Sequence, residues 1–213
     1  TTTPEKAAEA CGIAAQAEKW GVAAADFDHS SVVRFPEGHV SHSFELCRGV
    51  QDCDAFINVA KMKTHALERI TGAVKNLYGC IWSLNKAMGH ARYTSSDTFA
   101  DMLCDLHRCV KPRLHILDGI TAMEGNGPTS GTPVSMKLLL FSADPVALDS
   151  LFACLVHLSP DAVPTCVSGS KSGLGVMEAA CIRVLTPDGE ITVEQAVERF
   201  GKADFDVFRG RLR

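Results

Sequence analysis

The chain has 213 residues, of which 46% are hydrophobic and 22% are charged, and its formal net charge is -4 with a pI near 6.0. A chain of this length can bury a full hydrophobic core, so we expect one domain over residues 1–213. The acidic balance argues against a nucleic-acid-binding protein, and no apolar run is long enough to span a membrane.

The polar start, TTTPEKAAEA, has no initiator Met, basic region or apolar core. It is therefore not a signal peptide, and it indicates a fragment of a longer protein. The chain contains nine cysteines, and no two of them have the C-x-x-C spacing common in iron–sulfur and structural zinc sites. We interpret them as reduced, small apolar residues of a cytoplasmic protein, and we expect no metal site in this chain.

The first half of the chain predicts a helix, a hairpin, a strand and two further helices. An Ala-rich helix is expected over residues 5–19, and the turn PEGH predicts a β-hairpin over residues 31–46. Residues 54–60 are almost continuously apolar, which is typical of a strand buried on both faces. A helical period begins at Ala66 and reaches Ile81, and a second helix begins at Ser96.

The second half continues the alternation of strands and helices. RLHILD predicts a strand, GITAMEGNGPTSGTP a long loop, and VSMKLLLFS another strand. Asp144 and Pro145 begin a helix that extends to about His157, and residues 160–171 predict a further helix. CIRVL predicts a strand, and TVEQAVERF predicts a helix with a capping box. We therefore expect an α/β fold: a mostly parallel sheet flanked by helices, with the hairpin as an appendage.

A group of cations follows the strand over residues 54–60. Lys61, Lys63 and His65 share a parity, so an extended chain would direct them to the same side. Next to the start of the expected helix they could form an anion site, or they could be a solvated basic turn.

Two glycines flank Lys75 and Asn76 on the expected helix. Gly72, Lys75, Asn76 and Gly79 would lie on one face, and glycine in a helix interior costs about 1 kcal/mol relative to alanine. Such glycines indicate the close approach of a ligand or close packing against another element.

An acidic and polar loop follows the RLHILD strand. It contains Asp118, Glu124 and Asn126 among glycines and prolines. Ligands collect beyond the carboxyl ends of parallel strands, so this loop and the basic one should meet at one edge of the sheet. Asp118 and Glu124 could serve as general bases, as ligands of a divalent cation, or simply as solvated side chains.

Four other features of the sequence bear on possible sites. Asp144 is interpreted as a helix cap, whereas Asp149 lies on an almost wholly apolar helix and should be buried and hydrogen-bonded. His39 and His42 are placed on a strand, where they would face opposite ways. The segment SGSKSGLG resembles a phosphate loop only weakly, because it lacks the Walker spacing.

Together these segments resemble the bacterial and archaeal family called domain of unknown function 362. The resemblance extends from about Gly12 to Leu185 and is carried by INVAKMKTHALERITGAVKNLYGC, LHILDGITAMEGNGPTSGTP and LLLFSADPVALDSLFA. The family's motif positions fall on Lys61, Lys63, Thr64, His65, Lys75, Asn76, Asp118, Glu124, Asn126, Gly127, Asp144 and Asp149.

The resemblance implies no established catalytic role for these positions. Many members carry a bacterial-type ferredoxin module with two [4Fe-4S] clusters, and that module's cysteine run is absent here. Members also usually have an additional N-terminal α/β portion. Any [4Fe-4S] clusters are therefore expected on a missing C-terminal module, and no cofactor is expected in this chain.

Three functions remain open. The first is a domain that binds a small anionic substrate, a carboxylate or phosphate, in redox metabolism. The second is a non-catalytic docking domain for a ferredoxin module, and the third is a divalent-metal site on Asp118 and Glu124. In the first, a proton would be moved by His65, Glu124 or Asp118, and the anion would be held by Lys61, Lys63, Thr64, Lys75, Asn76, Asn126 and Gly127. Neither nucleic acid nor a membrane is expected as a partner.

Overall fold

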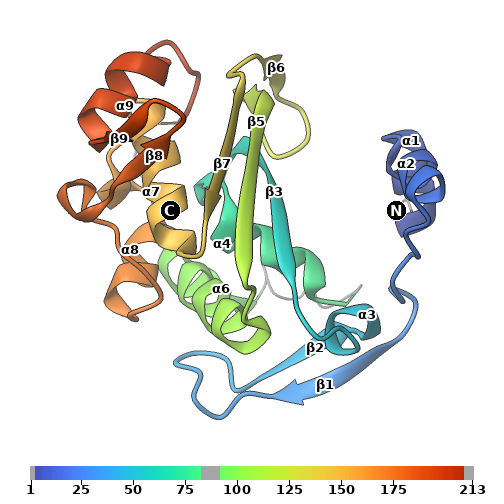
Figure 1. Cartoon of the computed structure of the whole chain (residues 1–213). Helices are drawn as coiled ribbons and strands as arrows, with labels where there is room; N and C mark the ends of the chain where they lie inside the picture. The colour runs from blue at the N-terminus through green and yellow to red at the C-terminus, as the bar shows by residue number, and fades with distance from the viewer. Residues whose placement is uncertain (1–2, 83–91, 209–213) are drawn as a thin grey trace.

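The structure is a computed structural model that describes residues 3–82 and 92–208. At its centre lies a mixed sheet in the order β4-β3-β5-β6, with β7 also paired to β5 (Figure 1). The strands are β3 (Ile57–His65), β4 (Arg69–Thr71), β5 (Leu114–Glu124), β6 (Thr132–Val134) and β7 (Leu138–Ser142).

The expectation of a mostly parallel sheet is not confirmed. β3 and β5 are parallel, whereas β4 pairs with β3, and β6 and β7 pair with β5, in antiparallel fashion. The connection lengths explain the difference. β3 and β5 are joined by a long crossover that contains helices, and short returns along the chain, such as residues 66–68 between β3 and β4, produce antiparallel neighbours.

The segment after β3 differs from the expectation. The strand continues through Lys61 to His65, because Met62 and Thr64 alternate into the interior. The helix expected from Ala66 is replaced by a turn, β4, the short helix α4 (Ala73–Asn76) and the 3-10 helix η1 (Leu77–Cys80). Arg69, in the left-handed region at a φ of 61°, lies at the start of β4.

Most of the expected helices are present. These are α6 (Ser96–Val110), α7 (Pro145–Leu155) capped by Asp144, α8 (Pro164–Lys171) after the 3-10 turn η2 (Pro160–Ala162), and α9 (Val193–Phe200) with the expected capping box. The N-terminal helix is divided at Gly12 into α1 (Pro4–Ala10) and α2 (Ile13–Trp20), which stand apart from the sheet (Figure 1). The CIRVL segment contributes β8 (Val184–Thr186), which pairs with β9 (Gly189–Ile191) after the 3-10 turn η3 (Ala179–Cys181).

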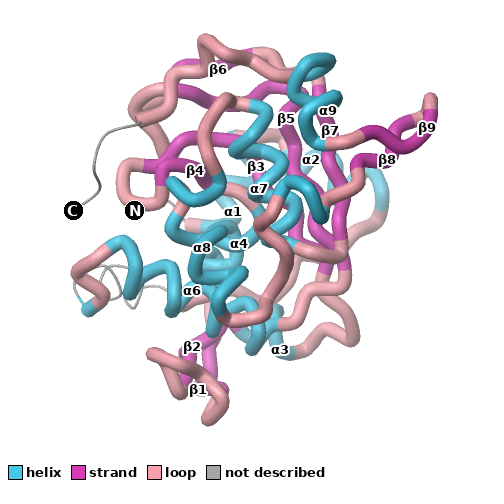
Figure 2. Tube along the Cα trace, turned by 90° about the vertical axis from the view of Figure 1, so that its left-hand side faces the viewer, coloured by secondary structure: helices cyan, strands magenta, loops and turns pink. Residues whose placement is uncertain are grey.

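The hairpin is confirmed as β1 (Ser30–Arg34) and β2 (Ser43–Cys47), followed by the short helix α3 (Arg48–Gln51). It projects from one end of the sheet, as the two views show (Figures 1 and 2). His39 and His42 lie in the turn between its strands rather than on a strand.

The two faces of the sheet differ. The helices α4, α6 and α7 lie along one face, where Ala60, Met62 and Leu117 are buried in the main core (Figure 2). The strands also carry large apolar side chains that remain exposed: Ile57, Val59, Ile120, Leu139 and Phe141. All nine cysteines have free thiols. Within residues 3–82 and 92–208, no helix is long and apolar enough to cross a membrane.

Candidate functional site at the carboxyl end of β3

The two segments singled out in the sequence do meet at one edge of the sheet. β3 and β5 run parallel, with Lys61 opposite Asp118 and Lys63 opposite Met123. The register shifts between these pairs, so β5 bulges where the segment that was expected to be a loop begins. Bulges of this kind often redirect side chains beside functional sites.

Lys61 and Asp118 neutralise each other. The Lys61 ammonium donates to the Asp118 carboxylate at 2.5 Å, and the backbone N–H of Ile120 donates to the same carboxylate. Partial burial raises the pKa of Asp118, but these hydrogen bonds and the lysine charge outweigh it and leave the pKa below its usual value. Lys61 is thus engaged by a carboxylate of its own sheet.

The loop after β5 packs directly on the end of β3. The hydroxyl of Thr64 donates to the carbonyl of Gly125 at 2.9 Å, and the Lys63 ammonium reaches the carbonyl of Pro128 at 3.4 Å. A Cβ at Gly127 would collide with the carbonyl oxygen of Thr64, so this close approach requires glycine. The loop and the strand touch at Thr64, leaving no room there for a ligand between them.

Glu124 and Asn126 occupy the outer part of this loop. The Glu124 carboxylate accepts from the backbone N–H of Asp206 at 3.0 Å, which ties the loop to the C-terminal segment. Asn126 is exposed, and its carbonyl accepts from the backbone N–H of Ser130. The Glu124 side chain is thus directed toward Asp206 rather than toward Lys63, whereas the Asn126 contact is made by its backbone.

His65 organises the turn that follows β3. Its Nδ1 accepts from the backbone N–H groups of Leu67 and Glu68 at 3.1 and 3.2 Å, and its side chain is buried. The ring therefore satisfies two backbone donors of this turn.

Asn76 and Asp149 hold α4 in place. Asn76 donates through Nδ2 to the side chain of Asn58 and to the carbonyl of Val59. Asp149 is 1% exposed and accepts from the backbone N–H groups of Ala73 and Val74 at 2.6 and 3.0 Å, so the expectation that it is buried and hydrogen-bonded is confirmed.

Of the two flanking glycines, one has the close approach that the sequence indicated. A Cβ at Gly72 would collide with the Asp149 carboxylate, whereas a Cβ at Gly79 would meet open space. The neighbour at Gly72 is a side chain of α7 rather than a ligand. Burial raises the pKa of Asp149 to about 7, and the two backbone hydrogen bonds oppose that shift.

Lys75 is the buried cation of this region. The residue is 9% exposed, and its ammonium lies 5.4 Å from the ring centre of Tyr78 and 5.6 Å from that of Phe99. Burial lowers its pKa to about 8; the charge of Glu68 raises the pKa and that of Lys63 lowers it. Lys63, half-buried, also has a pKa lowered by burial. The two lysines and Glu68 therefore form one electrostatic group.

Glu68 is the residue that the sequence did not reveal. It is 0% exposed, and neither carboxyl oxygen has a hydrogen-bond partner among the described residues. Burial raises its pKa to about 9, although the nearby Lys75 lowers it. Glu68 is therefore a neutral acid at pH 7. The sequence does show Glu68 a few residues after the lysines, but the helix expected from Ala66 includes it.

A second residue of this region also has a buried polar atom without a partner among the described residues. Thr71 is directly opposite Lys63 in the β3–β4 pair, and its buried hydroxyl has no partner among the described residues. Buried polar groups are normally hydrogen-bonded, and pairs of titratable groups with displaced pKa values cluster at functional sites. Lys63 and Lys75 can supply N–H donors to an anion, and protonated Glu68 can supply a proton.

Metal ligation receives no support from the described residues. They include no group of three or more His, Cys, Asp and Glu side chains that could hold an ion. Asp118 and Glu124 are each engaged elsewhere, by Lys61 and by the backbone of Asp206. The nine cysteines do not supply the set of four ligands that a [4Fe-4S] cluster takes.

The fold and this cluster define an α/β domain with buried lysines and an acid at a strand end, and comparison places it in a family. Residues 1–154 match the family described as Domain of unknown function (DUF362), and the chain belongs to it. It is also 36% identical over 150 residues to Thylakoid-associated protein sll1697 of Synechocystis sp., an alignment that covers 70% of this chain and 47% of that protein. The chain thus spans about half the length of this relative. No solved structure matches the chain.

Proposed function

We propose that this domain binds a small carboxylate or phosphate at the carboxyl end of β3, with Lys63 and Lys75 as its cationic donors. Protonated Glu68 donates a hydrogen bond to the bound group. The proposal narrows the site expected from the sequence, because Lys61 is neutralised by Asp118 and His65 organises a turn.

The observation that carries the proposal is the unpartnered carboxyl of Glu68 beside a buried lysine. A purely structural pair would be expected to form a direct hydrogen bond, since leaving buried polar atoms unpaired is unfavourable. Glu68 and Lys75 instead lie close enough to influence each other's pKa, yet neither Glu68 oxygen has a hydrogen-bond partner among the described residues. An anion at Lys63 and Lys75 would provide the missing acceptor, and protonated Glu68 would donate a hydrogen bond to its oxygen.

The redox assignment is a separate part of the proposal. It rests on the family's association with ferredoxin modules, and it places any [4Fe-4S] clusters outside the described residues. A cytoplasmic location is likewise proposed, supported by the free thiols; the relative's name gives that protein a thylakoid association.

The experiment is calorimetric titration with inorganic phosphate and with malonate as a dicarboxylate probe. Lys63→Ala and Lys75→Met should each weaken binding of the preferred probe by tenfold or more, since each removes one charged donor. Lys61→Ala is the matched control, because it removes a lysine two residues away whose charge is already paired with Asp118.

The outcomes separate clearly. If the Lys61 and Lys63 variants weaken probe binding equally, the effect is a diffuse one of surface charge, and the proposed site is contradicted. Loss of binding in the Lys75 variant counts only if its urea unfolding curve stays cooperative, because Lys75 packs on Tyr78 and Phe99. No binding of either probe by the wild-type protein would also contradict it.

A second function, docking of a protein, is supported by a different observation. Large apolar side chains of β3, β5 and β7, including Val59 and Phe141, are exposed, and contiguous exposed apolar surface is typical of an interaction site. The partner proposed is the ferredoxin module associated with the family. Val59→Ser with Phe141→Ser should abolish binding of a two-cluster ferredoxin while phosphate binding stays unchanged.

A further inference from the structure

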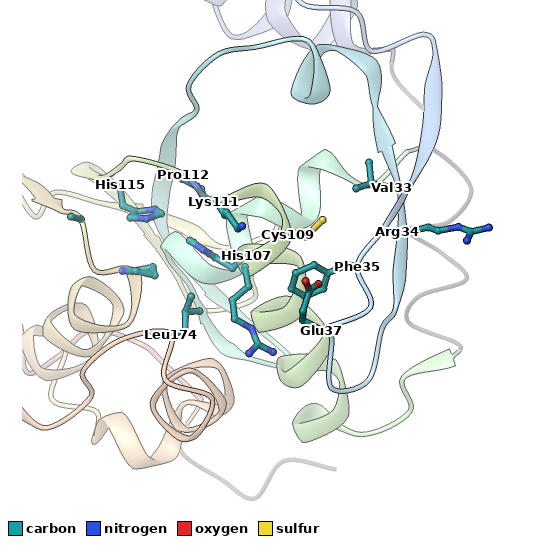
Figure 3. Close-up of a pocket in the computed structure, with 13 residues that line it drawn as sticks. Val33, Arg34, Phe35, Glu37, His107, Cys109, Lys111, Pro112, His115 and Leu174 are labelled. Atoms are coloured by element: carbon teal, nitrogen blue, oxygen red, sulfur yellow. The ribbon is translucent and has the colours of Figure 1, made fainter.

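A pocket lies at the other end of β5, away from the lysine cluster. It has a volume of about 650 Å³ and is bordered by the β1–β2 turn, the end of α6, and the starts of β5 and α7 (Figure 3). His107 and His115 lie side by side at this pocket, with their ring centres 4.8 Å apart (Figure 3). Its apolar lining includes Val33, Phe35, Pro145 and Leu174.

A buried carboxylate holds the two walls of the pocket together. Asp105 on α6 is 0% exposed and accepts from three backbone N–H groups of the β1–β2 turn, those of residues 39–41, at 2.8 to 3.0 Å. It also accepts from the Arg108 guanidinium at 2.6 Å. The turn and the helix end are therefore fixed relative to each other, so the pocket between them is a built feature.

The hydrogen bonds around His115 determine where its proton lies. Asn76 Nδ2 donates to both Asn58 Oδ1 and the carbonyl of Val59, which fixes the orientation of the Asn58 amide. Asn58 Nδ2 donates to the carbonyl of Ala73 and lies 3.1 Å from His115 Nδ1. The Nδ1 atom must then be an acceptor, so the neutral His115 ring carries its proton on Nε2.

Three polar atoms at this pocket are buried without partners among the described residues. They are His115 Nε2, His107 Nε2 and Arg108 Nε. His115 is 0% and His107 3% exposed, so bulk water does not satisfy these nitrogens. At least two of the three, His115 Nε2 and Arg108 Nε, carry a hydrogen and require an acceptor.

The tautomer of His115 favours an acceptor ligand over a metal ion. A histidine that binds a metal through Nε2 normally donates the hydrogen on Nδ1 to an oxygen acceptor. Here the Nδ1 of His115 faces an amide donor, Asn58 Nδ2, so freeing Nε2 for a metal would place two donors against each other. The described residues also contain no group of three metal-binding side chains.

We propose that this pocket binds a small organic carboxylate with an apolar body, independently of the site at Lys63. The carboxylate oxygens accept from His115 Nε2 and Arg108 Nε, and the body lies against Val33, Phe35 and Leu174. Charge-assisted hydrogen bonds from buried donors give the head group its specificity, while the walls contribute through apolar burial.

The two imidazoles remain neutral under ordinary conditions. Burial lowers the pKa of His107 to about 3 and that of His115 to about 4. The Nε2 hydrogen of His115 is therefore available as a donor throughout the physiological pH range, and the Nε–H of Arg108, whose guanidinium is paired with Asp105 through another nitrogen, is a second donor.

The test uses sodium hexanoate as the probe and hexanol as its neutral match, both titrated calorimetrically and followed by ¹⁵N spectra of the histidine rings. We expect hexanoate to bind and to move the His115 Nε2 resonance, and hexanol to bind at least tenfold more weakly. His115→Phe, which keeps a ring but lacks the donor, should weaken hexanoate binding tenfold or more and leave phosphate binding unchanged.

Arg108→Met provides a second variant in case His115→Phe does not fold, because Arg108 is partly exposed and Asp105 keeps its three backbone donors. It too should weaken hexanoate binding. Lys63→Ala should have no effect on hexanoate. The proposal is overturned if hexanol binds as well as hexanoate, if the histidine resonances do not respond, or if Lys63→Ala abolishes hexanoate binding.

Discussion

The two ends of the central sheet both bury titratable groups, but they respond to burial in opposite ways. At the carboxyl end, burial raises the pKa of Glu68 to about 9, so an acid keeps its proton. At the amino end, burial lowers the pKa of His107 and His115 to about 3 and 4, so two bases lose theirs. In each case the neutral form is favoured by the same loss of hydration.

Burial alone does not determine the pKa of a titratable group, because its hydrogen-bond partners also shift it. Two aspartates show this. Asp105 accepts hydrogen bonds from three backbone N–H groups and from an arginine. These bonds outweigh the effect of burial and leave the pKa of Asp105 below its usual value. Asp149 accepts only two backbone N–H groups, and its pKa rises to about 7. Asn58 joins the two regions, since it contacts both Asn76 on α4 and His115 on β5.

The largest expected effect is at Asp105. Asp105→Ala should lower the free energy of unfolding by about 3 kcal/mol or more, because it leaves Arg108 and three backbone donors without their buried acceptor. Urea unfolding at pH 7 measures this. Asp52→Ala, which breaks the exposed pair with Arg48, is the control and should change stability by about 0.5 kcal/mol or less. A small effect at Asp105 would mean that the turn is not anchored by this carboxylate.

Asp149→Ala should be destabilising to a smaller extent, about 2 kcal/mol, because two buried N–H groups at the start of α4 lose their acceptor. Differential scanning fluorimetry and urea unfolding both report it. Asp149→Asn, which keeps one acceptor oxygen, should recover part of the loss. Equal stability of the wild-type and alanine proteins would show that α4 does not depend on these two hydrogen bonds.

Because of the buried histidine pair, we expect the free energy of unfolding to fall in acid. Their folded pKa values lie below the unfolded value of 6.5, so the unfolded state binds more protons and stability falls as pH decreases from about 6.5 toward 3–4. Each site contributes a slope of at most about 1.4 kcal/mol per pH unit. His107→Phe should flatten the dependence measured by urea unfolding between pH 6.5 and 4.5. The same substitution at the exposed His42, whose side chain makes no ion pair with the described residues, should leave the curve unchanged.

Glu68 gives the opposite result: its contribution to the free energy of unfolding decreases as the pH rises. Its folded pKa of about 9 lies above its unfolded value of 4.5, so its contribution is fully present below pH 4.5 and is lost as pH rises through 9. Glu68→Gln should therefore reduce the decline in stability between pH 6 and 9, and Glu198→Gln on the exposed face of α9 should not. A variant that tracks the wild-type curve would place Glu68 in a hydrated environment and contradict its role as a buried acid.

The sequence predicted the parts of this arrangement that local pattern determines. Ser96 and Asp144 mark helices that are present, the capping box at Thr192 is formed, and the parallel pairing of β3 with β5 brings the two motif segments together. Asp149 was predicted to be buried because its helix is apolar on nearly every side. These features depend on neighbours within a few residues or on one strand pairing.

Other features depend on contacts that one sequence does not encode in its periodicity. β3 continues through Lys61 and Lys63 because Met62 and Thr64 face the core. The alternation of apolar and polar residues is visible in the sequence, but the abrupt change to cations favours a strand that ends in a basic loop. Glu68 and His107 were missed because their burial results from elements packing over them. A charged residue in a short turn gives no local signal that tertiary contacts will remove it from water.

The most direct test of the proposed anion site is a ¹³C-carboxyl NMR titration of Glu68 with and without inorganic phosphate. Without phosphate, the Glu68 carboxyl should be protonated at pH 7 and titrate near pH 9. Phosphate bound at Lys63 and Lys75 would add negative charge beside it, so the midpoint should move to higher pH. A carboxyl that titrates near pH 4.5, or one whose midpoint is unchanged by phosphate in the wild-type protein, would contradict the account.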